Sequence, residues 1–346
     1  MRFVSPLLRK VAYPALHSTG WLRRHFPRDG CAVVNYHGVL PPDPYRRLPF
    51  LDDNLVSTAT LREHLRFLKI NYNIIDPAMF RAWIENGGAP PPRSVLLTCD
   101  DGLMNNLSDM LPVFQSEGVQ CLFFVTGASV CEHPGMLWYE ELYHLLRSGE
   151  VSHEDVQIIF DTDGAERRES GFQAKWWRVV VSGSRLNARQ RADRIYLLRS
   201  KCRPVASTDC ERRWRLLNSR ELRQLAASGM TIGAHTVSHP VLSECSEEEA
   251  RCEIQESKTE IERVLGQAVW AFAYPFGNSA AMGDREVALA RQAGFECAFV
   301  NVSGGTVDPA EPFALSRTHV TGSMLLAELE AHLSGFHTRL QAAVRG

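Results

Sequence analysis

Two neighbouring carboxylates are the first candidates for chemistry. Residues 95–98 form an apolar run with the composition of a buried strand, and Cys99, Asp100, Asp101 and Gly102 follow it. Two adjacent negative charges repel each other, so a cation or hydrogen-bond donors must compensate them if they are buried. A bound metal ion would do this. The alternative is a turn or a helix N-cap, where Asp-Asp-Gly is also common.

Two histidines with ligand spacing are the second candidates. His235 and His239 lie four residues apart, directly after the apolar run at residues 230–234. They can converge on one ion if the segment forms a helical turn, because positions i and i+4 share a face. A lone histidine is usually structural, but this pair favours a metal site. With Asp101 they would form a mixed nitrogen and oxygen site with open positions for water and substrate, as in catalytic zinc or non-haem iron centres.

A strand that ends in a proline turn is the third candidate. Residues 272–277 read Phe-Ala-Tyr-Pro-Phe-Gly. Proline fixes the backbone, so the N–H of Phe276 could be aimed at one point. The alternative is an ordinary turn that terminates a strand.

Each of these motifs lies at the C-terminal end of an expected strand. We expect strands at residues 32–36, 95–98, 120–125, 230–234, 270–274 and 296–301, and helices at residues 60–70, 106–117, 219–227, 246–265 and 284–293. This alternation indicates repeated βα units around a parallel sheet or barrel. In such barrels the catalytic groups gather at the C-terminal edge of the strands.

The alternation stops between residues 131 and 214. This stretch is too long for a plain loop, so we expect an insertion with helices at residues 139–147 and 188–201 that forms a lid or flank over the barrel. The expected organisation is then a basic N-terminal extension (1–30), a barrel (31–320) interrupted by the insertion (131–214), and a C-terminal helix (321–346).

The N-terminal extension is basic. Six cations precede its first acidic residue: Arg2, Arg9, Lys10, Arg23, Arg24 and Arg28. Cations and prolines interrupt every apolar run, so we expect no signal peptide and a cytoplasmic protein. The extension either makes peripheral contact with an anionic membrane surface or packs as a helix on its own domain. No stretch approaches the roughly 20 apolar residues of a spanning helix.

Composition excludes several classes of protein. With 346 residues, 45% of them hydrophobic and 23% charged, the chain is globular. Its net charge of −2 and the lack of a clustered basic face argue against nucleic-acid binding. Nine irregularly spaced cysteines indicate reduced thiols. There is no GxSxG elbow of a serine esterase and no GxxxxGK[ST] nucleotide loop.

Taken together and in this order, the motifs resemble those of the polysaccharide deacetylases of carbohydrate esterase family 4, the NodB homology domain. The shared elements are the TxDDG run ending at Gly102, the HTxxH run ending at His239 and the YPFG run ending at Gly277. The Tyr-His-Gly at residues 36–38 resembles the end of the first strand in many members. The resemblance covers roughly residues 31–320, and a subgroup carries an insertion of this kind.

The resemblance implies a distorted (β/α)7 barrel with a large, mainly helical insertion and one divalent ion, usually zinc. It makes Asp100 the catalytic base, Asp101, His235 and His239 the metal ligands, and the amide of Phe276 the oxyanion donor. The implied reaction is hydrolysis of an N-acyl group, most often N-acetyl, on an amino sugar of an oligosaccharide, polysaccharide or glycolipid.

The chain departs from the family pattern at Ala273, and its general acid has one candidate. Members often carry an arginine two residues before the motif proline to orient the base; Ala273 stands there, and Arg317 is the candidate substitute. The general acid of the family is a late histidine, matched here by His319, with strand packing as the alternative. Three further candidates for contact with the substrate or the ligands are His37, Tyr274 and Pro275.

Two rival functions remain open at this stage. One is deformylation or deacylation of a lipid-linked amino sugar, which would use the same catalytic residues. The other is a non-catalytic, metal-containing carbohydrate-binding barrel. Ala273 in place of the family's arginine allows this function, whereas the presence of Asp100 disfavours it. Tryptophans of the insertion either stack on sugar rings or pack it onto the barrel: Trp138, Trp176 and Trp177.

Overall fold

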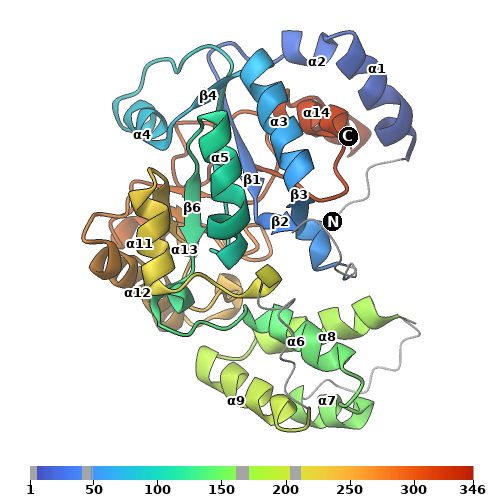
Figure 1. The fold of residues 1–346 in the computed structure, drawn as a ribbon, viewed down its shortest axis with the longest axis vertical. Helices are drawn as coiled ribbons and strands as arrows, with labels where there is room; N and C mark the ends of the chain where they lie inside the picture. Colours follow the sequence, from blue (N-terminus) through green and yellow to red (C-terminus); the bar gives the residue numbers. More distant parts are fainter. Residues whose placement is uncertain (1–5, 41–47, 49, 161–170, 203–211, 346) are drawn as a thin grey trace.

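A curled parallel sheet forms the centre of the molecule. The computed structural model describes residues 6–40, 48, 50–160, 171–202 and 212–345, and within them eight strands form one sheet (Figure 1). The strand order is β10-β1-β5-β6-β7-β8-β9, with β4 paired to β5 beside this path, and every pairing is parallel. The strands are β1 (Cys31–Tyr36), β4 (Asn73–Ile75), β5 (Ser94–Cys99), β6 (Leu122–Val125), β7 (Thr231–Ala234), β8 (Ala271–Ala273), β9 (Cys297–Phe299) and β10 (Thr318–His319).

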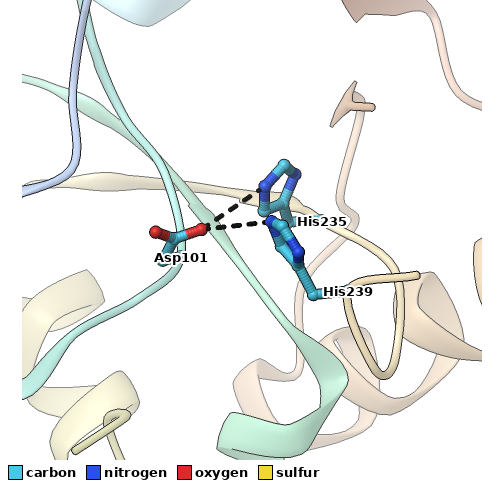
Figure 2. A group of neighbouring side chains, drawn as sticks. All are labelled: Asp101, His235 and His239. Carbon is cyan, nitrogen blue, oxygen red and sulfur yellow. Dashed lines mark ion pairs between the residues drawn. The ribbon is translucent and has the colours of Figure 1, made fainter. Parts of the chain in front are cut away.

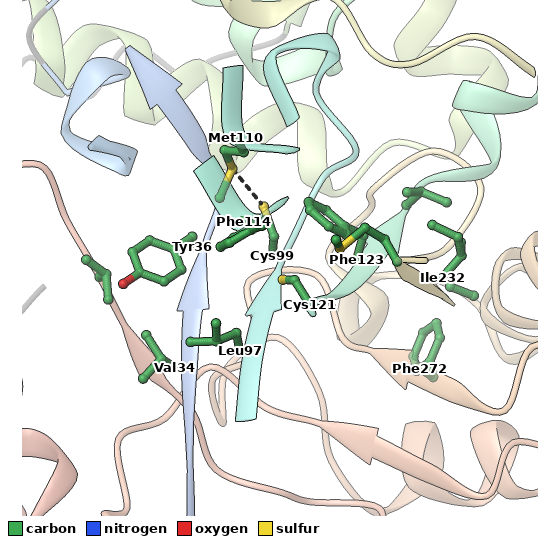
Figure 3. Packing of buried hydrophobic residues seen from close by; sticks show 14 of the residues in the cluster. Val34, Tyr36, Leu97, Cys99, Met110, Phe114, Cys121, Phe123, Ile232 and Phe272 are labelled. Atoms are coloured by element: carbon green, nitrogen blue, oxygen red, sulfur yellow. Dashed lines mark hydrogen bonds between the residues drawn. The ribbon is translucent and has the colours of Figure 1, made fainter. Parts of the chain in front are cut away.

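Helices cover the outer face of this sheet. They are α3 (Thr58–Asn71), α5 (Leu111–Glu117), α11 (Ser219–Ala227), α12 (Glu247–Leu265) and α13 (Asp284–Gln292). Helix α4 (Pro77–Asn86) instead packs Phe80 and Trp83 into the apolar interior of the curled sheet. A two-stranded sheet, β2 (Gly38–Leu40) with β3 (Leu55–Ser57), lies beside the C-terminal end of β1. Figure 3 shows strand residues such as Val34 and Leu97 packed with Met110 and Phe114 of the helical layer.

Alternation of side chains along the buried strands separates two apolar layers. Val34 and Leu97 belong to the outer layer, whereas their neighbours Val33 and Leu96 belong to an inner cluster. Strands buried on both faces need apolar residues at both sets of positions, as β1 and β5 have here. Phe299 of β9 joins the same inner cluster as Val33, so strands from both ends of the strand order share one interior and the sheet is curled.

The elements predicted from hydrophobic period are confirmed. The six predicted strands are present as β1, β5, β6, β7, β8 and β9, with ends shifted by at most two residues, and α11 spans the predicted residues 219–227. The predicted helix at residues 106–117 is divided into η3 (Asn106–Met110), a π-helical turn, and α5. Strands β2, β3, β4 and β10 were not predicted, because two or three residues are too few to show a period.

The segment predicted as an insertion contains four described helices. They are α6 (Trp138–Arg147), α7 (His153–Phe160), α8 (Phe172–Ser184) and α9 (Ala188–Arg199), of which α7 and α8 were not predicted. The helices lie together at one end of the molecule (Figure 1) and share an apolar cluster that includes Leu142, Trp176 and Leu198. The cluster continues into Leu55 and Leu103 of the barrel, so the helical unit is packed against it.

The N-terminal segment packs against the C-terminal one. Helices η1 (Leu8–Ala12), α1 (Tyr13–Ser18) and α2 (Trp21–Arg24) lie beside α14 (Leu326–Leu333), and Arg23 Nε contacts Glu330 Oε1 at 2.8 Å. His17 Nδ1 lies 2.5 Å from the other oxygen of Glu330, and Arg9 pairs with Glu328. These contacts correspond to the packing alternative for the basic extension. Among the described helices, none has the length and apolar character needed to span a membrane.

The C-terminal segment forms two helices rather than the single one expected. Helix α14 ends before Gly335, which has a φ of 70°, and α15 (Phe336–Arg345) follows. A left-handed glycine at this point ends the first helix and redirects the chain.

The buried carboxylate of Glu330 makes the N-terminal packing testable. We expect Glu330→Ala to lower the free energy of unfolding by about 2–3 kcal/mol, because Arg23 and His17 lose their partner at a site where Glu330 is fully buried. Urea unfolding would measure this. Glu260→Ala, which removes the exposed pair with Arg263, is the control and should cost about 0.5 kcal/mol or less. Equal losses would show that the N-terminal contact is no stronger than a surface pair.

Candidate functional site

The inner layer of the barrel changes from apolar to polar at its C-terminal edge. On β1 the inward positions run from Val33 to Asn35, and on β5 they run from Leu96 to Thr98 and then to Asp100. Thr98 donates to Asn35 Oδ1 at 3.0 Å, and Asn35 donates to Asp100 Oδ2 at 2.8 Å. The period of two along each strand therefore places a buried polar cluster above the apolar interior.

Asp101, His235 and His239 come together at this edge. One ligand atom from each lies within 4.8 Å of the others, and all three residues are buried. Asp101 Oδ1 is 3.6 Å from His235 Nε2 and 3.4 Å from His239 Nε2. Figure 2 shows both imidazole rings directed at the carboxylate.

The two histidines converge through an irregular backbone that their spacing in the sequence does not predict. Residues 235–240, called the histidine loop below, form no helical turn. Thr236 and His239 instead take left-handed backbone conformations, with φ of 63° and 55°. The predicted helical turn is thus absent from this segment, although the two rings do face one site. The left-handed conformations of Thr236 and His239 direct both imidazole rings to one site, and the rings do not share the face of a helix.

The donor set fits a divalent cation. Burial lowers the pKa of His235 to about 4, so its imidazole is neutral and Nε2 can offer a lone pair. Its Nδ1–H donates to the carbonyl of Ala273 at 2.7 Å, which selects this tautomer and fixes the ring. Within the described residues, Asp101 Oδ1 is buried and accepts no hydrogen bond. A buried carboxylate oxygen that faces two imidazole nitrogens has the chemistry of a mixed nitrogen and oxygen metal site.

Backbone strain is concentrated at this site. Among the described residues, six non-glycine residues have positive φ, and four of them are Asp101, Thr236, His239 and Phe276. Each such conformation costs on the order of 1–3 kcal/mol and persists only where the surrounding structure imposes it. The folded structure therefore maintains a geometry that the isolated segments would not adopt.

Asp100 is paired with the arginine predicted as a substitute. Arg317 Nη1 and Nη2 donate to the two carboxylate oxygens of Asp100 at 2.7 and 2.8 Å, and both side chains are buried. Burial alone would raise the pKa of Asp100, but Arg317 outweighs it and the pKa lies below its usual range. The carboxylate is therefore ionised and held in one orientation. The rings of Phe124 and Phe299 pack against the guanidinium, and their centroids lie 5.3 and 5.9 Å from its central carbon.

His319 and His37 lie side by side near this pair. Their ring centroids are 4.6 Å apart, and His319 is in register with Asn35 across β1 and β10. Burial, together with the neighbouring His37, lowers the pKa of His319 to about 3. His319 Nε2 and His37 Nδ1 are buried and have no hydrogen-bond partner within the described residues. The structure thus brings two candidate proton carriers together rather than one.

The proline turn contributes a backbone group. Phe276 has a φ of 59°, and its N–H donates no hydrogen bond within the described part of the chain. Its ring packs against the rings of His239 and Tyr139, with 4.9 and 5.8 Å between the ring centroids. Pro275 accepts from the Gly277 N–H at 2.6 Å and so closes the turn.

Tyr274 lies outside this cluster. Its ring is packed in the outer apolar layer, and its hydroxyl donates to the carbonyl of Phe313 at 3.1 Å. The structure therefore gives Tyr274 a packing role, whereas the neighbouring turn faces the site.

Sequence reasoning missed two residues of the site. Asn35 could have been found, since it lies on β1 two positions before His37, and alternate residues of a strand face the same side. Tyr139 had no local signal, because it reaches His239 from α6, with 5.3 Å between their ring centroids. Of the three tryptophans weighed as sugar platforms, Trp138 and Trp176 are buried, and only Trp177 is half exposed.

Comparison with known proteins supports the resemblance. A family model described as polysaccharide deacetylase matches residues 204–298, which include both histidines and the proline turn. The polysaccharide deacetylase homologue YxkH of Bacillus subtilis (strain 168) is 23% identical over 133 residues, which are 38% of this chain and 44% of that protein. The chain therefore spans less than half of the length of this curated relative.

Solved structures match over most of the chain. They include the Streptococcus pyogenes deacetylase PplD in complex with acetate, with 15% identity, a TM-score of 0.56, and coverage of 88% of this chain and 99% of that one. IcaB from Ammonifex degensii has 17% identity, a TM-score of 0.55 and coverage of 90% and 99%. A de-N-acetylase from Aggregatibacter actinomycetemcomitans has 13% identity, a TM-score of 0.56 and coverage of 88% and 100%. At these identities they establish the fold.

The predicted resemblance and the predicted fold class are therefore confirmed. The chain resembles the polysaccharide deacetylases in sequence at residues 204–298, and it has their distorted (β/α) barrel with helical additions.

The buried pair of Asp100 and Arg317 gives a prediction on stability. Arg317→Met leaves the Asp100 carboxylate buried beside Asp101 with only the Asn35 amide as a donor. We expect the free energy of unfolding to fall by about 3–5 kcal/mol. Urea unfolding of Arg317→Met, Asp100→Asn and the double variant would measure it. The double variant should lose at least about 1 kcal/mol less than the sum of the single losses, and strict additivity would contradict a direct pair.

Proposed function

We propose that this protein is a metal-dependent hydrolase that removes an N-acyl group, in the first instance N-acetyl, from an amino sugar of a glycan or glycoconjugate. The observation that carries the proposal is the buried group of Asp101, His235 and His239 next to the ionised Asp100. The family match and the shared fold support it. The acetate in the Streptococcus pyogenes deacetylase agrees with a small acyl product.

In this proposal the metal site and the base divide the work. A divalent ion held by Asp101, His235 and His239, with zinc as the candidate, would act as a Lewis acid toward the amide carbonyl and the attacking water. Asp100 accepts the proton of that water. Arg317 keeps Asp100 ionised and bound through both oxygens, so the base does not rotate away from the water.

The oxyanion and the leaving amine need donors from the chain. The N–H of Phe276, which has no acceptor among the described residues, is available for the oxygen that gains negative charge. The amine must gain a proton as the C–N bond breaks, and His319 and His37 are the nearby carriers. His319 is neutral at physiological pH, since its pKa lies near 3, so it must first accept a proton before it can donate one.

Two narrower assignments remain alternatives within this proposal. A deformylase or deacylase of a lipid-linked amino sugar would use the same residues and differ only in substrate. A carbohydrate-binding barrel without turnover would keep the three ligands but would have no need for the Asp100 and Arg317 pair. Comparing acyl release from different substrates tests the first alternative. Measuring whether any substrate is hydrolysed at all tests the second.

Replacing the proposed base separates catalysis from metal binding. We expect Asp100→Asn to retain one zinc per chain but to release acetate about 10²–10⁴-fold more slowly, because the amide cannot accept the proton. Metal content and acetate or formate release would be measured together, on N-acetylated glycans and on lipid-linked amino sugars. Asp101→Asn is the matched control and should lose the zinc. Thermal unfolding would confirm that both variants fold.

Either of two results would contradict the proposal. Zinc-loaded wild-type protein that releases no acyl group from any of these substrates would favour the binding barrel. Equal release by Asp100→Asn and the wild type would remove Asp100 from the reaction.

Substrates with different leaving groups can show which of His37 and His319 protonates the departing amine. We expect the residue that protonates the amine to be the one whose replacement by Gln slows sugar amide hydrolysis about 10²–10⁴-fold. The same variant should lose much less activity on p-nitrophenyl acetate, whose leaving group needs no proton. His37→Gln and His319→Gln would be compared on both substrates. Losses that are equal on the amide and the ester would assign that histidine to packing or positioning.

A further inference from the structure

The histidine loop depends on contacts from outside itself. Thr236 and His239 are held in left-handed conformations, and within the loop His239 N–H donates to Thr236 Oγ1 at 3.1 Å. A β-branched residue such as Thr rarely adopts positive φ. The Thr236 hydroxyl also donates to the carbonyl of His235, but two internal hydrogen bonds, at about 1 kcal/mol each, are too weak to impose two conformations that each cost on the order of 1–3 kcal/mol.

A buried glutamate of the barrel binds the middle of the loop. Glu253 of α12 is 9% exposed, and one of its carboxylate oxygens accepts from the N–H groups of Val237 and Ser238, both at 2.8 Å. Its other oxygen accepts from the Ser238 hydroxyl at 2.6 Å. The barrel thus fixes the loop from one side.

Arg191 reaches the same serine from the insertion. It lies on α9, is 3% exposed, and donates to Ser238 Oγ at 2.9 Å and to the carbonyl of Leu186 at 3.1 Å. Ser238 therefore connects the arginine of the insertion with Glu253 of the barrel. The central guanidinium carbon of Arg191 also lies over the ring of Trp138, 4.9 Å from its centre.

Helix α6 contacts the ligand residue itself. Trp138 is 8% exposed, and its Nε1–H donates to the backbone carbonyl of His239 at 2.9 Å. The next residue, Tyr139, places its ring against the imidazole of His239. Trp176 of α8 donates to the carbonyl of Tyr139 at 2.8 Å, so a third helix holds this segment in place.

We propose that the helical insertion is a positioning element of the metal site, in which Trp138 and Arg191 hold the histidine loop in its ligating conformation. The proposal rests on the metal site of the proposed function. It gives the insertion a role that a mobile lid would not have: displacing α6 and α9 removes the hydrogen bonds that orient His239. Trp138 and Arg191 touch neither substrate nor metal and act through His239 and Ser238.

Zinc affinity of variants tests this directly. Trp138→Phe keeps an aromatic ring but removes the N–H that binds His239, and Arg191→Met keeps a long side chain but removes the donor to Ser238. We expect each to weaken zinc binding about 10–100-fold, as for other residues that orient a ligand. Competition with a chromophoric chelator would measure the affinity. Arg191→Lys, which can still donate to Ser238, should recover part of it.

A matched control lies on the same helix. Arg194 of α9 donates to the carbonyl of Ile159 within the insertion and has no contact with the histidine loop among those described. Arg194→Met should lower the melting temperature but leave zinc affinity within about 3-fold. Wild-type affinity in Trp138→Phe and Arg191→Met, or an equal loss in Arg194→Met, would overturn the proposal.

Hydrogen exchange in zinc-free protein separates this proposal from the proposed function. We expect a peptide that covers residues 235–240 to exchange at least about 10-fold faster in Arg191→Met than in the wild type, with Arg194→Met unchanged. Unchanged exchange in Arg191→Met would refute the positioning role. Wild-type protein that binds zinc but hydrolyses no substrate would refute only the hydrolase, whereas failure to bind zinc would refute the metal site.

Discussion

Two adjacent carboxylates buried at the end of β5 impose the constraint that the rest of the site satisfies. Neither can remain charged in the interior without compensation, and a single partner cannot serve both. Arg317 and Asn35 compensate Asp100, while Asp101 faces the two imidazoles. The left-handed backbone at Asp101 directs the second carboxylate away from the first. One is a fixed, ionised acceptor and the other a candidate metal ligand, although they are neighbours in sequence.

The barrel and the helical insertion share the task of holding this arrangement. Strands β1 and β5 place the polar cluster by simple alternation, which needs no help from other elements. The histidine loop has no such regular geometry, so it depends on hydrogen bonds from α12 on one side and from α6 and α9 on the other. Regular structure thus positions Asp100, the proposed base, whereas tertiary contacts position His239, a proposed metal ligand.

The sequence predicts what local pattern encodes and misses what tertiary contact creates. Long apolar runs gave the six main strands, and the spacing of His235 and His239 gave the ligand pair. The short strands β4 and β10 carry no period, and nothing local to Tyr139 indicates that it meets His239. The contact of Arg317 with Asp100 spans 217 positions; only the family pattern, in which a cation accompanies the base, directed attention to it. The conformation of the histidine loop was beyond local rules, because its neighbours impose it.

One detail of the first histidine bears on how such a site can diverge. The group that selects the tautomer of His235 is the main-chain carbonyl of Ala273, not its side chain. Any amino acid at position 273 provides the same carbonyl. The tautomer of His235 therefore does not depend on the side chain at that position. The side chain at this position is limited only by the space around Ala273, which is fully buried in the inner apolar cluster. An arginine at the end of β8, as in the family pattern, and Arg317 before β10 would meet the same electrostatic requirement, which is compensation of the Asp100 carboxylate.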